Sequence, residues 1–559
     1  MRKGIRIILL VLSCFPILLF IILSVIGVFL YHTADFLQPN VCVNHNDYEL
    51  VIENDSLRMC RNGRLHLNKY GHWEVVLSGN AVDRGAAYGL MSKDLLKYQK
   101  DVFVDQIHEI IPSEWWVEFL HKVIIIFNRN MGNHIPQELR EEIYAMSISC
   151  TDEYNAYGSP YVRQLNYHAA HDIGHAMQEY MLVGCSSFAV WGYESSDDEL
   201  LIGRNFDFYV GDRFAENKVV LFVEPTSGYK FASVSWPGMM GVLSGMNEKG
   251  LTVTINAAKG ALPLSSAMPI SLLTRQILQY ASTIDEAYDI AQQYKTFVSE
   301  SILVGSSSEG TAAIIEKTPE KVALTRSQTQ RLICTNHYQS EEFADDDYNK
   351  ENMMTSDSPY RYERLSELIQ EKTPIDHHDA AYILRNRYGL GNKDIGVGNE
   401  KAINQFIAHH SVIFQPGELR MWVSSSPWQL GEYVCYDLDD VFCDVGSESI
   451  SYALDKYNIV EDSALMSNEY IRVCSYRKQC EEINDAIAKK SQLSDTIIEE
   501  FISNNPLYYQ VYNVVGDYMA SVDQTQQAVS YWRKALSLEI PRMGEREDIQ
   551  NKISKYDKE

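Results

Sequence analysis

The stretch Met181-Leu-Val-Gly-Cys-Ser-Ser-Phe-Ala-Val-Trp-Gly192 (MLVGCSSFAVWG) places a Gly-Cys step at the start of a segment with the pattern of a β-strand. The cysteine has two interpretations. It is either a small apolar residue of a buried core, a common role for cysteine, or the Gly184–Cys185 bond is a cleavage site that converts Cys185 into a new N-terminus. The second interpretation requires charged and polar partners for the thiol.

The residues after Cys185 predict a β-hairpin that carries two such partners. Residues 186–208 contain two strand-like segments around an acidic loop of turn-forming residues. This fold-back places Phe188 opposite Arg204 and Asp207 opposite Cys185. A buried Asp–Arg pair beside a thiol is costly to build, so the pair favours a functional site.

Three later segments each place a polar side chain at the end of a strand or after a turn. A second hairpin is predicted over 245–257, and its polar face ends on Asn256. A later apolar strand leads to Asn336. Arg361 follows a turn-favouring Ser-Pro step, and Arg364, one helical turn further on, is an alternative to it.

Taken in order, these residues resemble the series found in the N-terminal-nucleophile (Ntn) hydrolases of the linear-amide branch. The series is Cys185, Gly203-Arg-Asn-Phe-Asp-Phe208, Asn256, Asn336 and Arg361. That branch includes choloylglycine (bile salt) hydrolases, acid ceramidase-like amidases and the autoproteolytic penicillin acyltransferase group. The last group is the most similar, because here too a long segment precedes the cysteine. The resemblance covers 185–440 well and 70–184 loosely.

The resemblance implies an α+β fold built as a four-layer αββα sandwich, with a cysteine activated by its own amine. Cleavage before Cys185 would free an α-amino group with an ordinary pKa of about 7.7–8.0, which can accept the thiol proton. Arg204 would lower the thiol pKa further by its positive charge. Asp207 would hold the amine and thereby orient the nucleophile.

The implied reaction is the cleavage of a linear amide through a thioester. Asn256 would stabilise the oxyanion, while Asn336 and Arg361 would position the amine or the substrate. Transfer of the acyl group to water makes the protein a cysteine amidase acting on an N-acyl compound; transfer to another amine makes it an acyltransferase. A third hypothesis is a non-catalytic scaffold in which the C-terminal helices carry the function.

Composition excludes nucleic acid as a partner. The net charge is −26, with 49 Lys and Arg against 75 Asp and Glu, and phosphate binding needs clustered basic residues. The expected partner is a small-molecule N-acyl amide. His168, His171 and His175 share one helical face, but the His-Glu-x-x-His arrangement of a zinc protease is missing. We therefore predict a packed helix face, with no metal and no cofactor.

Five regions are predicted along the chain. The uncharged apolar run from Ile7 to about Tyr31 is long enough for the ~20 residues of a membrane span, and the basic residues before it predict a cytoplasmic start. The catalytic domain would then be anchored to a membrane and extracytoplasmic, where acyl-CoA is not expected, which favours hydrolysis. The regions are a transmembrane anchor (1–34), a mostly helical segment (35–184), the catalytic domain (185–440), a helical linker (441–490) and a tetratricopeptide-like region (491–559).

The last region has the residue spacing of a tetratricopeptide helix pair. Gly516 and Ala528 are small enough to let two helices approach, and Trp532 would fill the gap between them. Structural packing is one interpretation of this pattern, and binding of a protein partner or self-association is the other.

Ten cysteines are too few for a disulfide scaffold in a chain of 559 residues. Outside the cytoplasm, Cys435 with Cys443 and Cys474 with Cys480 are candidate pairs. Cys185 would have to stay free in order to react.

Overall fold

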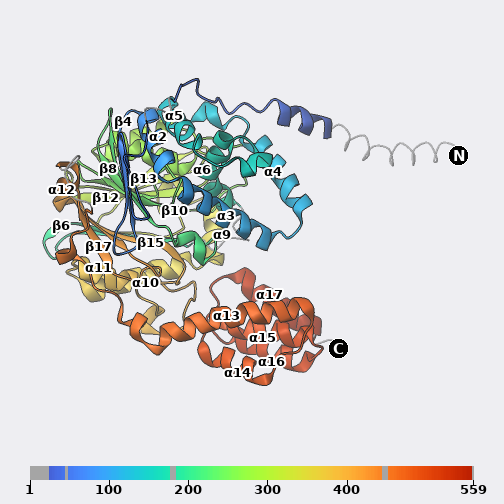
Figure 1. The fold of residues 1–559 in the computed structure, drawn as a ribbon. Coiled ribbons are helices and arrows are strands. Elements are labelled where there is room, and N and C mark those ends of the chain that lie inside the picture. The colour runs from blue at the N-terminus through green and yellow to red at the C-terminus, as the bar shows by residue number, and fades with distance from the viewer. Residues whose placement is uncertain (1–23, 44–47, 177–183, 444–450, 557–559) are drawn as a thin grey trace, which may run out of the picture.

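The computed structural model describes residues 24–43, 48–176, 184–443 and 451–556. The fold is mixed α+β, as predicted, and the described strands form two sheets (Figure 1). The larger sheet has eleven described strands in the order β1-β2-β3-β4-β7-β8-β9-β10-β11-β12-β13. Their bounds are β1 Ile52–Glu53, β2 Leu57–Cys60, β3 Gly63–Leu67, β4 Trp73–Gly79, β7 Val219–Pro225, β8 Phe231–Ser235, β9 Ser244–Asn247, β10 Leu251–Ala257, β11 Glu300–Ser306, β12 Thr311–Lys317 and β13 Val322–Arg326.

The smaller sheet begins directly after Cys185 and has the described order β14-β5-β6-β15-β16-β17. Its strands are β14 Arg331–Cys334, β5 Ser186–Gly192, β6 Asp198–Asp207, β15 Ala408–Gln415, β16 Arg420–Ser424 and β17 Tyr433–Asp437. The two sheets face each other across one apolar cluster, to which Ala189 and Ile202 contribute from the smaller sheet and Val220 and Leu303 from the larger. Alternate residues of each strand therefore point into the space between the sheets.

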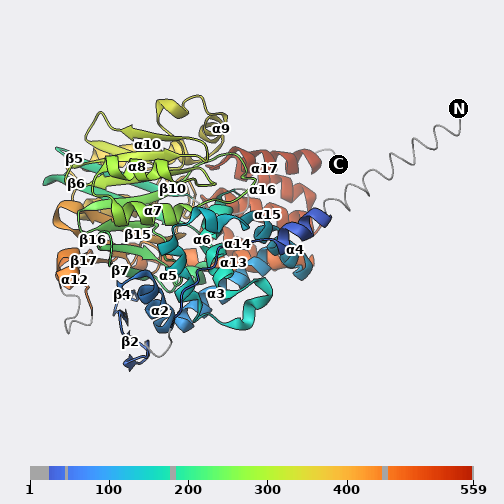
Figure 2. The same ribbon diagram turned by 90° about the horizontal axis from the view of Figure 1, so that it is seen from above.

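Helices cover the outer faces of both sheets (Figure 2). α7 and α8 lie on the larger sheet over β10 to β12, and α10 and α11 lie on the smaller sheet over β14, β6 and β15. The helices of this part are α2 Ala81–Met91, α3 Lys93–Ile110, α4 Glu114–Asn128, α5 Gln137–Ser147, α6 Pro160–Ala176, α7 Ile270–Tyr280, α8 Ile284–Gln293, α9 Asp347–Thr355, α10 Ser358–Lys372, α11 His377–Leu384 and α12 Leu438–Cys443.

The segment before Cys185 is built into the larger sheet. β4 runs parallel to β7, with Trp73 opposite Val219. Val75 and Leu77 on β4 are fully buried, which fits a strand in the interior of a sheet. The helical character predicted for this segment is present in α2 to α6. The division into five regions stays a prediction.

The hairpin after Cys185 forms, but its predicted register is wrong by one residue. Ser187, rather than Phe188, lies opposite Arg204. The pairing shifts between Val190 and Gly192, near the turn. Such an irregularity changes the register of everything beyond it, and a regular alternation of polar and apolar residues does not reveal it.

The helical C-terminal region is confirmed. We call α13 to α17 the C-terminal helical unit; it lies below the sheets in Figure 1. Its helices are α13 Asn468–Lys489, α14 Asp495–Asn504, α15 Tyr509–Ser521, α16 Thr525–Leu536 and α17 Met543–Tyr556. A Cβ atom on Gly516 would lie 2.5 Å from Cδ1 of Trp532. α15 and α16 therefore pack closely because residue 516 has no side chain, as the sequence predicted.

The predicted transmembrane anchor, and with it the membrane-anchored extracytoplasmic location, is corrected. In the part of the chain that the structure describes, no helix has both the length and the apolar character needed to cross a membrane. Of the predicted segment, helix is described only over residues 24–32. Residues 1–23 lie outside the described residues.

The two candidate disulfide pairs are not formed, because Cys435, Cys443, Cys474 and Cys480 are all free. Cys435 is buried in β17, whereas Cys443 is exposed at the end of α12. Cys474 and Cys480 both belong to α13 and point to different faces of it, since one helical turn takes 3.6 residues.

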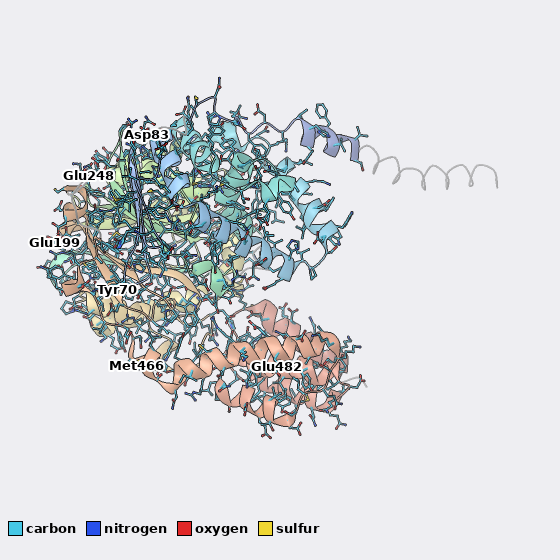
Figure 3. All side chains as sticks on the ribbon, in the orientation of Figure 1. Tyr70, Asp83, Glu199, Glu248, Met466 and Glu482 are labelled. Carbon is cyan, nitrogen blue, oxygen red and sulfur yellow. The ribbon has the colours of Figure 1, made fainter. Side chains whose placement is uncertain are left out.

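Acidic side chains lie around the outline of both parts of the molecule (Figure 3). Asp83, Glu199 and Glu248 lie on the part that contains the sheets, and Glu482 lies on the C-terminal helical unit.

Candidate active site

The structure brings the six predicted site residues into one cluster near the start of β5. Cys185 precedes β5, Arg204 and Asp207 belong to β6, Asn256 belongs to β10, Asn336 follows β14, and Arg361 lies in the first turn of α10. All except the partly buried Asn336 are buried. Both sheets and one outer helix therefore contribute to the cluster.

Arg204 is the cationic neighbour of the Cys185 sulfur. Its Nη2 lies 3.9 Å from Sγ and donates to Ile255 O at 2.6 Å. Its Nη1 donates to Ser244 Oγ and lies 3.1 Å from His410 Nε2. These contacts from three strands hold the guanidinium in one place.

Burial and charge act on the Cys185 thiol in opposite directions. The side chain is fully buried, and this burial raises the pKa of the thiol to about 11, against a lowering by Arg204; Asp207 and Glu300 raise it as well. The predicted direction of the Arg204 effect is right, but the net shift of the pKa is upward because desolvation outweighs it. Such a thiol needs a base in order to react at neutral pH.

Asp207 is a buried carboxylate that lacks a hydrogen-bond donor. Neither of its carboxylate oxygens has a hydrogen-bond partner among the described residues. Its backbone O accepts from Gly184 N at 3.1 Å, which places the residue beside the Gly184–Cys185 bond. Burial raises the pKa of Asp207 to about 8, although Arg361 and Arg204 lower it. Because buried polar groups are almost always hydrogen-bonded, this carboxylate marks a position where a donor is needed.

Arg361, rather than Arg364, reaches the candidate nucleophile. Arg361 Nη1 donates to Cys185 O at 2.6 Å, and its Nη2 donates to Asn336 Oδ1 at 2.6 Å. Arg364 instead donates to Asn386 Oδ1 from Nε at 3.3 Å and from Nη2 at 3.2 Å. Of the two arginines that the sequence left as alternatives, this geometry favours Arg361 over Arg364.

Both predicted asparagines direct their side-chain amides at backbone carbonyls. Asn256 Nδ2 donates to Cys334 O at 2.9 Å and to Thr335 O at 3.2 Å, and Asn336 Nδ2 donates to Ala257 O at 2.8 Å. Asn256 thus ties β10 of the larger sheet to the end of β14 in the smaller one. Stabilisation of an oxyanion by this amide would require it to give up one of these bonds.

Three polar residues of the site were not predicted from the sequence: Gln405, His410 and Asp357. Gln405 Nε2 donates to Gly184 O at 3.4 Å, so it contacts the carbonyl of the predicted cleavage bond. Asp357 Oδ2 accepts from Arg361 Nε at 3.0 Å. Asp357 alone had a local signal, because an acidic residue four positions before an arginine on a helix favours an ion pair.

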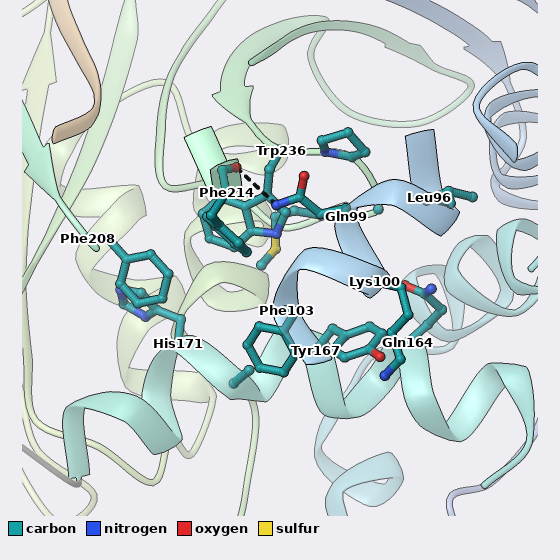
Figure 4. A pocket seen from close by; sticks show the side chains of 14 residues that line it. Leu96, Gln99, Lys100, Phe103, Gln164, Tyr167, His171, Phe208, Phe214 and Trp236 are labelled. Carbon is teal, nitrogen blue, oxygen red and sulfur yellow. Dashed lines mark hydrogen bonds between the residues drawn. The ribbon is translucent and has the colours of Figure 1, made fainter. Parts of the chain in front are cut away.

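A cavity of about 40 Å³ lies beside the site (Figure 4). His171 and Phe208 line one side of it, and Lys100 and Tyr167 lie on the opposite side of the view. The His171 ring packs 5.6 Å from the ring of Phe206, over which the guanidinium of Arg204 stands. The other lining residues are Leu96, Gln99, Phe103, Gln164, Ala170, Phe214, Trp236, Pro237, Gly238 and Met239. The walls are mainly apolar, with several aromatic rings, and suit an apolar group.

Lys100 places a titratable amine in the wall of this cavity. Its Nζ lies 4.2 Å from the ring centre of Tyr167 and 5.1 Å from that of Tyr154. Burial lowers the pKa of Lys100 to about 7, and the charge of Arg163 adds to this effect. The cavity therefore changes its charge close to neutral pH.

The histidine face of α6 is packed around the site. Both ring nitrogens of His168 bond to backbone groups; the side chain of His175 lies outside the described residues. His171 lies with Asp172 and Glu300, and their potential ligand atoms are within 4.8 Å of one another. Among the described residues this trio has the geometry for a metal ion, but one carboxylate oxygen of Asp172 already accepts a backbone N–H at the start of α7.

A mixed α+β fold with two facing sheets, and a cysteine held between two arginines at the start of a strand, define a candidate cysteine-nucleophile enzyme. Residues 194–424 match the acyl-coenzyme A:6-aminopenicillanic acid acyl-transferase family. This match confirms the resemblance to penicillin acyltransferase-type Ntn hydrolases. It spans less than half of the chain; it contains Arg204 and Arg361, and Cys185 precedes it.

Two relatives are similar over longer stretches. An uncharacterized protein of Archaeoglobus fulgidus is 25% identical over 407 residues, which cover 64% of this chain and 65% of that protein. Protein dcd1B of Dictyostelium discoideum is 23% identical over 272 residues, which cover 45% of this chain and 52% of that protein. The chain thus spans less than two thirds of the length of either relative.

Two solved structures also show a partial likeness. The Caenorhabditis elegans ortholog of N-acylethanolamine-hydrolyzing acid amidase has 16% sequence identity and a TM-score of 0.30, over 42% of this chain and 93% of its own. A mutant conjugated bile acid hydrolase from Clostridium perfringens has 13% identity and a TM-score of 0.30, over 43% of this chain and 89% of its own. We base no conclusion on these superpositions.

Proposed function

We propose that this chain is a self-processing cysteine amidase of the Ntn type, which hydrolyses the linear, non-peptide C–N bond of an N-acyl compound. In this proposal the two facing sheets with their outer helices are the αββα sandwich. The observation that carries it is the buried carboxylate of Asp207, which has no hydrogen-bond partner among the described residues. The backbone O of the same residue accepts from Gly184 N, next to the Gly184–Cys185 bond. An α-amine released at Cys185 would supply that donor.

In the processing reaction, Cys185 cuts its own N-terminal peptide bond. Its Sγ adds to the carbonyl carbon of Gly184 while Gln405 donates to the carbonyl oxygen. The peptide nitrogen leaves with the thiol proton, so that the acyl group moves from nitrogen to sulfur. Water then hydrolyses this thioester, which leaves a carboxylate on Gly184 and a free α-amino group on Cys185.

In turnover, the new α-amine takes the thiol proton, and the thiolate attacks the carbonyl carbon of the substrate amide. The amine product leaves with that proton, and an acyl thioester remains on Cys185. Water adds to the thioester, and the acid is released as the thiol re-forms. Asp207 holds the α-ammonium, Arg204 stabilises the thiolate, and Arg361 with Asn336 fixes the backbone of the nucleophile.

Asn256 remains the proposed oxyanion donor, and one donor of this kind contributes roughly 10²–10³ in rate. The aromatic cavity beside Phe208 is proposed to hold the apolar part of the acyl group. The residues named above supply a nucleophile, a base and charge stabilisation, so the proposed chemistry uses no cofactor.

Intact-mass measurement of the purified protein tests the proposal. Wild type is expected to give two pieces that separate before Cys185, and Cys185→Ala is expected to remain one chain. Cys435→Ala removes another buried thiol, on β17, and should be processed as wild type is. Processed wild type should release acid from members of a panel of N-acyl amides. A wild type that stays whole and does not act on any of these amides would refute the proposal.

Acyl transfer is the second candidate, and the match to an acyl-transferase family favours it. The preference for hydrolysis that rested on an extracytoplasmic location no longer applies. Product ratios measured with and without a competing amine separate the two reactions. A transferase forms the new amide in preference to the free acid, whereas a hydrolase forms acid under both conditions.

A further inference from the structure

Asp357 connects the candidate active site to the C-terminal helical unit. It is the N-cap residue of α10, but its side chain makes no capping hydrogen bond. The carboxylate lies between two guanidinium groups instead: Oδ2 accepts from Arg361 Nε at 3.0 Å, and Oδ1 lies 3.9 Å from Arg542 Nε. Asp357 and Arg361 are 5% and 1% exposed, so little water screens these contacts.

The far end of Arg361 contacts the nucleophile candidate itself. Its two terminal nitrogens donate to Cys185 O and to Asn336 Oδ1, each at 2.6 Å. Nη1 also donates to Ser186 Oγ at 3.1 Å. The position of the guanidinium thus depends on four acceptors, and the Asp357 carboxylate is the charged one. A group that fixes Asp357 also fixes the direction in which Arg361 points.

The surroundings of Arg542 leave Asp357 as its main charged partner. Glu400 and Glu545 lie close to the same guanidinium. Burial raises the pKa of Glu400 to about 8, and it raises the pKa of Glu545 as well. A pKa of about 8 means that Glu400 favours its neutral form near neutral pH, so it competes weakly with Asp357 for Arg542.

Other contacts hold the C-terminal helical unit in the position from which Arg542 reaches Asp357. Val397 N donates to Asn505 Oδ1 at 3.0 Å, and Asn505 Nδ2 donates to Val397 O at 2.8 Å. Lys393 and Lys401 form ion pairs with Glu539 at 2.7 and 2.8 Å. Arg542 therefore approaches α10 from a docked unit.

We propose that Arg542 is a positioning residue for the proposed reaction: it holds Asp357, and through Asp357 it keeps Arg361 on the Cys185 carbonyl and on Asn336. The proposal rests on the proposed function, since it assigns a role at the same site. It gives the C-terminal helical unit a part in catalysis without any contact to the substrate.

The test compares full-length Arg542→Gln and Arg542→Lys with Arg546→Gln, which changes an exposed arginine on α17. We expect Arg542→Gln to lower kcat for an N-acyl amide about tenfold, equivalent to about 1.4 kcal/mol, and to leave KM within about twofold. Arg542→Lys keeps the charge without the planar fork and should recover part of the rate. Arg546→Gln should match wild type.

A double-mutant cycle with Asp357→Asn shows whether Arg542 acts through Asp357. If it does, the double variant loses no more rate than the worse single variant, because residues of one network are not additive. The proposal would be overturned if the rate losses of the two single variants multiply in the double variant. It would also be overturned if Arg542→Gln is as active as Arg546→Gln. If Arg542→Gln and Arg542→Lys lower the melting temperature equally and Arg542→Lys recovers no rate, the loss of activity comes from a general loss of folding. This result also counts against the proposal.

A second measurement separates this proposal from the proposed function. The rate at which iodoacetamide alkylates Cys185, followed by peptide mass spectrometry, reports the geometry of the nucleophile without a substrate. If wild type hydrolyses no amide, the proposed function fails. A changed alkylation rate in Arg542→Gln and an unchanged one in Arg546→Gln would still support the positioning role, and equal rates in both would refute it.

Discussion

The fold makes the Cys185 thiol a poor nucleophile until a base accepts its proton. A buried thiol with a pKa of about 11 is almost fully protonated at neutral pH. The α-amine that cleavage would release has an ordinary pKa of about 7.7–8.0 and can act as this base. The bond that must break first is that of Gly184, and Gln405 is the side chain that donates to its carbonyl oxygen.

Replacing Gln405 by alanine should slow self-cleavage. An oxyanion donor contributes roughly 10²–10³ in rate; we expect about a tenfold effect, because the 3.4 Å contact is long. A time course of intact mass after expression measures the rate. Gln415→Ala removes a similar side chain at the far end of β15 and serves as the control. Equal cleavage rates in the two variants would contradict the role of Gln405.

Lys100 should give the acyl cavity a pH dependence. Its amine loses the proton as pH rises through about 7, and an apolar acyl group is bound better beside a neutral amine than beside an ammonium. We expect KM for an apolar N-acyl amide to fall as pH rises from 6 to 8 in wild type, and to stay flat in Lys100→Met. Lys122→Met, on the exposed face of α4, is the control. An identical KM profile in all three proteins would show that the acyl group binds elsewhere.

The order and type of the site residues could be predicted from the sequence, but the direction of their side chains could not. Cys185, Arg204 and Arg361 could be predicted because they belong to a series of residue types that follow one another in a fixed order along the sequence. Gln405 contacts Gly184 from a loop far along the chain, and no local pattern marks it. The amide of Asn256 turns to carbonyls of the other sheet, so its orientation depends on how the two sheets meet.

At the scale of elements, β5 and β6 approach closely at Gly203. A Cβ atom at this position would lie 2.6 Å from Cε1 of Phe188 and 3.3 Å from Cδ1 of Leu384. The absence of a side chain lets the Phe188 ring lie against the neighbouring strand. Arg204 is the next residue, so this packing also fixes the strand that presents the guanidinium.

Gly203→Ala should lower the free energy of unfolding by about 1–3 kcal/mol, as overpacking of a core does, and should also lower the rate of amide hydrolysis. Chemical denaturation and kcat measure the two effects. Gly544→Ala adds the same methyl group in α17, where nothing lies within 4 Å. It is expected to leave kcat unchanged and to raise stability by up to ~1 kcal/mol, because alanine favours a helix over glycine. A Gly203→Ala variant as stable as wild type would contradict the prediction, because it would show that the Phe188 ring moves aside for the added methyl group at little cost.

Helices and turns that depend on residues close together in the sequence could be predicted, whereas the pairing of strands that are far apart in the sequence could not. The pairing of α15 with α16 followed from Gly516 and Trp532. α7 and α8 are separate helices, because the Thr283 side chain accepts the N–H of Glu286 and starts α8 there. Strand order depends on contacts between remote segments, and no periodicity in the sequence encodes it.

At the scale of the whole molecule, the C-terminal helical unit docks on the loop that leads to β15. A Cβ atom on Gly396 would lie 2.4 Å from Tyr508 N. Gly396 has a φ of +84°, which glycine adopts without strain. The backbone of the loop therefore touches the backbone of the unit directly.

Gly396→Ala should loosen this docking. Hydrogen exchange at residues 397, 505 and 507–512 should become about tenfold faster or more, since overpacking costs about 1–3 kcal/mol. Gly391→Ala is the matched control: its φ is also positive, at +62°, but nothing lies within 4 Å of its Cβ position. Equal hydrogen-exchange rates in the two variants would mean that backbone strain at the substituted residue, rather than the clash with Tyr508, causes the faster exchange.

The place of β4 in the larger sheet determines what the proposed maturation would produce. β4 lies between β3 and β7, and its seven residues belong to the piece upstream of Cys185. Breaking one peptide bond would therefore yield two polypeptides that share a single sheet, joined where β4 pairs with β7. Under denaturing electrophoresis the mature protein would run as two bands, yet it would elute from a sizing column as one particle. The upstream piece would be a permanent subunit, and removing it would require unfolding the enzyme.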